Sequence, residues 1–238
     1  METFIVRDSE QDLQGNISHI CTAKASLDGT IHWMVLHIIQ DTFQTALEIG
    51  DANLKRRKVS DLERIAMGVL DGLDVGLEIR RCTIQEHLKW LSSEISKSSY
   101  KLPLLGHALD RDIEFMYATD LASRSESKFF DGHPLRFPGN QRKSWQKINK
   151  VCTQRLLTSC CPITFELVNP GAKFGTVTLS HLTYALLHRV QKHNAVSDVL
   201  DLIAVLSKAH SLDQFKLPKE NFLIIKPDNS VKIHTGTA

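Results

Sequence analysis

The sequence predicts an α/β fold in which a mixed central β-sheet is flanked by α-helices. Two observations lead to this prediction. The chain opens with three β-branched, apolar runs, and beyond them segments of helical periodicity alternate with short apolar runs. Strands that are followed by alternating helices and strands pack as a mixed sheet covered by helices. We find no internal repeat and no low-complexity tract in the chain.

Three strands are expected at the start of the chain, over residues 3–7, 17–25 and 30–38. The pair Asp28-Gly29 lies between the second and third runs, and Asp-Gly between two such runs is a hairpin signal. The three strands should therefore be antiparallel neighbours.

Helices and further strands follow. Ser60 and Glu63 form a capping-box pattern before a helix, and a second helix is expected over residues 83–96. A short apolar run at residues 102–105 predicts a buried strand. Another helix should begin near Asp110.

The second half of the chain is less regular. Residues 120–144 lose periodicity and predict a long loop. The remaining elements are a strand running into a short helix over 147–159, helices over 178–187 and 193–209, and two short β-like runs within 221–234. We expect one large domain over 1–210, with a loop insertion at about 120–144, and a C-terminal tail or hairpin over 211–238.

Composition narrows the class of protein. The chain has 238 residues, of which 42% are hydrophobic and 24% charged, as in globular domains with a real core. A net charge of +2 excludes a histone-like polycation. The apolar runs are too short to cross a bilayer, and the N-terminus lacks a signal-peptide pattern, so we expect a cytoplasmic or nuclear protein with no membrane partner. Five cysteines without regular spacing argue against a disulfide framework.

Acidic residues follow the first strand. Asp8 and Glu10 are two positions apart, which places them on the same side of an extended backbone. Carboxylate oxygens are the ligands that Mg²⁺ and Mn²⁺ prefer. The alternative for both residues is a solvated strand end.

Two later segments carry similar chemistry. In the first, an apolar run leads into Gly106-His107, and Asp112 follows in the next predicted helix; its alternative role is a helix-dipole acid. In the second, His193 and Asp198 are five residues apart, which suits a histidine in a loop and an aspartate within a helix. The alternative for His193 is a surface loop histidine. Each motif alone is expected by chance in a chain of this composition, and only the order and the context of the three motifs make them informative.

Together, these motifs resemble the DEDDh (DnaQ-like) family of 3′→5′ exonucleases. The resemblance covers about residues 3–209, and its specific part is the three motifs. It implies an RNase H-like fold and release of nucleoside 5′-monophosphates from the 3′ end of single-stranded DNA or RNA. It also implies two Mg²⁺ or Mn²⁺ ions bound by Asp8, Glu10, Asp112 and Asp198, with His193 as general base. His107 would orient the turn.

The sequence also departs from the family pattern. Arg7 precedes Asp8, where the family has an apolar residue, and Ala108 follows His107, where asparagine is frequent. These departures indicate a divergent member. The alternative function is a catalytically inactive nucleic-acid-binding or scaffold subunit of a polymerase or processing complex, with the C-terminal tail from Asp213 docking on a protein partner.

Two further patterns concern the basic residues and the cysteines. Basic residues are candidates for nucleic-acid backbone contacts, although short basic runs are often only solvated surface; the candidates are Lys55, Arg56, Arg57, Lys58, Arg142, Lys143 and Lys147. Cys152, Cys160 and Cys161, with His133 or His181, lack a standard zinc spacing and are better interpreted as free thiols.

Overall fold

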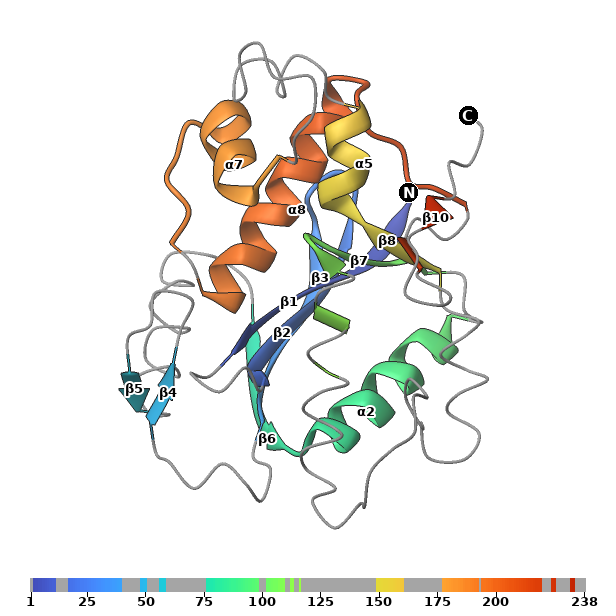
Figure 1. Cartoon of the computed structure of the whole chain (residues 1–238). Helices are drawn as coiled ribbons and strands as arrows, with labels where there is room; N and C mark the ends of the chain where they lie inside the picture. Colours follow the sequence, from blue (N-terminus) through green and yellow to red (C-terminus); the bar gives the residue numbers. More distant parts are fainter. Residues whose placement is uncertain are drawn as a thin grey trace.

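In the computed structural model of the chain, the described residues form a central sheet and the helices around it (Figure 1). The described residues are 2–11, 17–39, 48–50, 56–58, 76–98, 102–109, 112–113, 116, 149–160, 177–192, 194–219, 224–225 and 232–233.

A six-stranded sheet forms the centre of the fold, with the strand order β6-β3-β2-β1-β7-β8. Its strands are β1 (Thr3–Gln11), β2 (Ile17–Ser26), β3 (Ile31–Ile39), β6 (Leu77–Cys82), β7 (Leu104–Gly106) and β8 (Lys150–Cys152). β2 runs antiparallel to both its neighbours, whereas the pairs β3–β6, β1–β7 and β7–β8 are parallel. The predicted α/β fold with a mixed central sheet flanked by helices is confirmed.

The three N-terminal strands are connected as predicted. β1 pairs with β2 from Thr3↔Ser26 to Gln11↔Ile17. Gly29 completes the next turn with a φ of 90°, a conformation that glycine adopts without steric cost. The Oδ1 atom of Asp28 accepts a hydrogen bond of 3.0 Å from the Thr30 amide. The Asp-Gly pair thus sets the hairpin between β2 and β3.

Helices cover both faces of the sheet: α2 lies on one side, and α5, α7 and α8 lie on the other (Figure 1). Their bounds are α2 (Ile84–Lys97), α5 (Thr153–Cys160), α7 (Leu179–Leu187) and α8 (Ala195–Ser211). Side chains cap three of the N-termini, namely Thr83 with Glu86 in a capping box, Thr178, and Asn194. Each cap satisfies amides that the first helical turn leaves unpaired.

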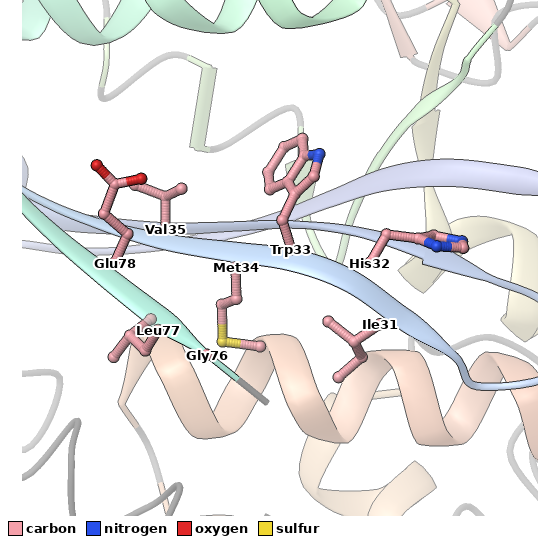
Figure 2. A pocket seen from close by; sticks show the side chains of 8 residues that line it. All are labelled: Ile31, His32, Trp33, Met34, Val35, Gly76, Leu77 and Glu78. Atoms are coloured by element: carbon pink, nitrogen blue, oxygen red, sulfur yellow. The ribbon is translucent and has the colours of Figure 1, made fainter. Parts of the chain in front are cut away.

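Two apolar clusters hold the layers together. The larger lies between the sheet and α8 and includes Phe4 and Val6, while the second lies under α2 and includes Ile5. This alternation follows from the period of two along a strand. Figure 2 shows it at the β3–β6 edge, where Met34 points toward the helix α8 and Trp33 points to the opposite face.

Several elements were not predicted. β6 was not predicted, although Leu77 and Ile79 alternate with polar residues. The short antiparallel pair of β4 (Glu48–Gly50) and β5 (Arg56–Lys58) was also missed. At the C-terminus, β9 (Ile224–Ile225) and β10 (Lys232–Ile233) form the expected hairpin.

Other predictions lie outside the described residues. These are the helix after Ser60 and the loop over 120–144. The division at residue 210 stays a prediction; Phe215, just beyond it, is buried in the larger core. Among the helices that the structure describes, none has the length and apolarity that a membrane crossing requires.

Candidate metal centre

Asp8 and Glu10 lie on β1 and point to the α8 side of the sheet, because they share the alternation of Phe4 and Val6. Glu10 is buried and Asp8 is half-buried. Asp8 stands opposite Cys21 of β2. A central strand with neighbours on both sides therefore fixes the backbone that carries both carboxylates.

Asp198 approaches the same place from α8. The Asn194 side chain caps this helix by accepting a 2.9 Å hydrogen bond from the Ser197 amide. Asp198 is in the first turn, where a negative charge is stabilised by the helix dipole, and it is buried. One ligand oxygen from each of Asp8, Glu10 and Asp198 lies within 4.8 Å of the other two.

The carboxylates repel one another strongly in this setting. The pKa of Asp8 is raised well above its usual value, first by burial and then by the charges of Asp198, Asp112 and Glu10. The same environment raises the pKa of the neighbouring Cys21 thiol, chiefly through burial and then through Asp8 and Asp198. A cluster of carboxylates of this kind favours cations.

Asp112 is near enough for its charge to act on Asp8, but it is not part of the compact group of three. It follows β7, which runs parallel to β1 with Val6 opposite Leu105. Parallel neighbours bring their carboxyl ends to one edge of the sheet, and this explains why the second motif arrives beside the first.

The turn after β7 is tightly constrained. A Cβ atom added to Gly106 would lie 3.0 Å from the Leu109 side chain and 3.2 Å from the Arg7 carbonyl oxygen. The His107 Nε2 atom donates a 3.0 Å hydrogen bond to the Val177 carbonyl, and burial lowers the pKa of His107 to about 4. His107 is therefore a neutral residue that ties the turn to the segment before α7.

The donor set fits a hard divalent cation. All the ligand atoms are carboxylate oxygens, and an octahedral Mg²⁺ with bonds of about 2.1 Å places opposite ligands roughly 4.2 Å apart. Oxygens within 4.8 Å of one another need only a small closure to reach that geometry. Asp8, Glu10 and Asp198 would hold the ion.

Several predicted residues cannot be placed. His193, Lys55, Arg142, Lys143 and Lys147 lie outside the described residues, as do His133 and Cys161. Arg56, Arg57 and Lys58 make up the strand β5, of which the structure describes the backbone. Cys152 is a buried free thiol in the core under α2.

One basic surface was missed from the sequence. A groove along α8 begins at Ser197, beside Asp198, and is lined by Arg189, Lys192 and Lys208 among others. Arg189 forms an ion pair with Asp201, and Lys192 and Lys208 are exposed. No basic run marks these residues, because they are dispersed along the chain and only the packing of α7 and α8 brings them to one surface.

The hollow at the β3–β6 edge is a different place (Figure 2). It lies two strands away from β1, and its lining carries a single carboxylate among the described residues, that of Glu78. It is not part of the candidate metal centre.

Comparison with known proteins gives distant structural similarity without a match in sequence. No protein-family model matches this chain, and no curated protein matches it in sequence. Among solved structures, the chain is similar to Escherichia coli ExoI in the zinc-bound form of its complex with single-stranded DNA, with a TM-score of 0.46 and 13% identity. The match covers 89% of this chain and 41% of that chain. At this level of similarity no residue role carries over from one protein to the other.

Proposed function

We propose that this protein is a metal-dependent 3′→5′ exonuclease that hydrolyses nucleic-acid phosphodiesters to nucleoside 5′-monophosphates. The observation that carries the proposal is the convergence of Asp8, Glu10 and Asp198, two of them from β1 and one from α8, on a point where their oxygens lie within 4.8 Å. The order of the three motifs along the chain, which resembles that of DEDDh exonucleases, supports it.

Each residue has a role in this proposal. Asp8, Glu10, Asp112 and Asp198 bind Mg²⁺ or Mn²⁺, and two such ions would activate water and stabilise the charge that develops on the leaving oxygen. His193, which directly precedes the Asn194 cap of α8 in the sequence, accepts a proton from the attacking water. The 3′ end of single-stranded DNA or RNA is the proposed substrate.

Backbone contacts would come from basic residues around the site. Lys192 and Lys208 in the groove along α8 join the candidates from the sequence, namely Lys55, Arg56, Arg57, Lys58, Arg142, Lys143 and Lys147. Phosphate contacts of this kind make binding weaken as salt rises.

An inactive nucleic-acid-binding or scaffold subunit is the second candidate. The observation in its favour is Arg7, a fully buried residue directly before Asp8. Burial lowers the pKa of Arg7, and the charges of Asp112 and Asp8 oppose that shift. A built-in cation near the carboxylates reduces their need for metal ions. In this case the tail from Asp213 would bind the protein partner.

A nuclease assay separates the two candidates. End-labelled single-stranded DNA and RNA are incubated with the full chain and Mn²⁺ or Mg²⁺, beside Asp8→Ala and the exposed control Glu2→Ala. We expect shortening from the 3′ end by the wild type and by Glu2→Ala, and a loss of about a thousandfold or more in Asp8→Ala, because the carboxylates act as one unit. Retained binding without cleavage by the wild type would favour the scaffold.

A further inference from the structure

The layer between the sheet and α2 contains a buried polar cluster that the candidate metal centre does not use. It consists of Arg7 on β1, Thr22 on β2, His37 on β3 and His87 on α2, each at most 1% exposed. Ser9 and Ser92 are buried in the same layer. The surrounding side chains are apolar residues of the second cluster, such as Ile5, Ile20 and Leu91.

Strand register shows that these four residues are neighbours. Arg7 is directly opposite Thr22, and Thr22 is opposite Val35, two residues before His37 on the same face. Opposite and diagonal positions of this kind bring side chains into reach of one another. The His87 ring lies over His37, with ring centroids 4.8 Å apart, and Trp90 lies 4.5 Å from His37.

The polar atoms of the cluster are poorly satisfied by the protein. Nη1 of Arg7 donates to the Met116 sulfur, which is a weak acceptor. Within the described part of the chain, no group hydrogen-bonds to Nε or Nη2 of Arg7, Oγ1 of Thr22, Nδ1 of His37 or either ring nitrogen of His87. Buried polar atoms of folded proteins nearly always have hydrogen-bond partners. Because several unpaired polar atoms lie in this one layer, we expect an ion or a small molecule to bind there.

The charge of the layer indicates what kind of occupant. Arg7 carries a positive charge, and its guanidinium offers donors alone. Burial lowers the pKa of His37 to about 4 and that of His87 well below its usual value, so both rings are neutral at pH 7 and each has one N–H to donate. Asp112 and Asp8 both attract Arg7, Asp112 more strongly and Asp8 from the opposite face of the sheet. Neither acid hydrogen-bonds to Nε or Nη2 of the guanidinium, and the complement of these free donors and of the neutral imidazoles is a small anion.

We propose that Arg7, Thr22, His37 and His87 form a binding site for a small inorganic anion, chloride being the form to test, buried between the sheet and α2. The near-complete burial of all four residues excludes a nucleotide or a phosphorylated chain as the occupant. The site lies on the face of the sheet opposite Asp8 and Glu10, and it does not depend on the proposed nuclease function. The competing occupant is ordered water.

Thermal unfolding of the full chain tests the site. Chloride is raised at constant ionic strength against gluconate, which is too large to enter the layer. We expect the melting temperature of the wild type to rise by about 5 °C or more once chloride reaches about a hundred times its dissociation constant. Arg7→Met, which keeps an unbranched apolar chain beside Met116, should lose the rise. The exposed control Arg81→Met should keep it.

Two further measurements guard against a variant that does not fold. Thr22→Val, close to isosteric, should reduce the chloride response without removing the guanidinium. Crystals of the wild type grown in bromide should show one anomalous peak within hydrogen-bonding distance of Arg7 and His87. An equal chloride response in the wild type and Arg7→Met, or bromide crystals with water alone at this place, would overturn the proposal.

Discussion

Ala108 has a left-handed backbone conformation, with a φ of 60°, at the turn that follows β7. An L-residue with a Cβ atom is strained there, whereas glycine is not, and asparagine is tolerated better than alanine. Asparagine, which is frequent at this position in the DEDDh family that the motifs resemble, would therefore be less strained after His107 than alanine is. The position also matters for the site, because the Ala108 carbonyl accepts the hydrogen bond of the Asp112 amide at 3.3 Å.

Replacing Ala108 by glycine should therefore stabilise the protein. We expect Ala108→Gly to raise the free energy of unfolding by about 1 kcal/mol, since relief of the left-handed strain exceeds the entropy that glycine adds to the unfolded chain. Denaturant titration measures the change. Ala204→Gly inside α8 is the matched control and should lower stability by about 1 kcal/mol. A decrease in Ala108→Gly would contradict the strained conformation.

Among the elements, β1 carries acidic side chains on one face and a basic side chain on the other. Its even positions Asp8 and Glu10 face α8 and form the acidic centre, while Arg7 faces α2 and joins the histidine layer. The docking of α2 therefore involves buried imidazoles as well as leucines and isoleucines. These imidazoles make the packing of α2 sensitive to pH.

We expect the buried histidines to make the protein lose stability as pH falls from about 6.5 toward about 4, whereas Asp8, whose pKa is raised, contributes a slope of the opposite sign. The pKa of His37 is lowered from 6.5 to about 4 by burial, Arg80 and Arg7, with Glu78 opposing, and that of His87 is lowered by burial, His37 and Arg7. The unfolded chain then binds protons that the folded chain does not, and each histidine contributes a slope of up to about 1.4 kcal/mol per pH unit.

Chemical denaturation across this pH range checks the contribution of α2. His87→Phe should lose stability less steeply than the wild type, because it removes one of the groups that must take up a proton on unfolding. His107, whose pKa is also lowered to about 4, makes its own contribution to the slope in both proteins. Identical slopes in His87→Phe and the wild type would refute the assignment.

At the scale of the whole molecule, the fold brings together acids that are far apart in the sequence. β1 provides Asp8 and Glu10, the segment after β7 provides Asp112, and α8 provides Asp198. Their mutual repulsion opposes folding, as the raised pKa of Asp8 shows. A cation that binds the folded chain alone offsets this cost.

Metal ions should therefore stabilise the protein. We expect Mg²⁺ or Mn²⁺ at about a hundred times the dissociation constant to raise the melting temperature by about 5–10 °C. Asp198→Asn should melt higher than the wild type without metal, because one repelling charge is gone, and should gain less on adding metal. Glu2→Gln is the control that should respond as the wild type does. A wild type that shows no rise would count against the centre.

Local patterns in the sequence were enough to predict most elements. Apolar, β-branched runs predicted β1 to β3, the Asp-Gly pair predicted the hairpin, and helical periodicity predicted α2, α7 and α8. β6 escaped because its half-buried pattern is shorter and more polar, so its alternation is a weak signal. The motifs also pointed to Asp8, Glu10 and Asp198, since acids at a strand end and in a first helical turn are local features.

Sequence patterns thus predicted most of the strands and helices and the carboxylates that they carry, because these features depend on the near neighbours of each residue. Long-range packing places oxygens of β1 and α8 within 4.8 Å of one another and places Arg7 in the layer of α2 with His37 and His87. Such contacts depend on strand order, register and helix packing, which join residues distant in the chain. Burial, and with it every pKa shift described above, follows from the same long-range packing.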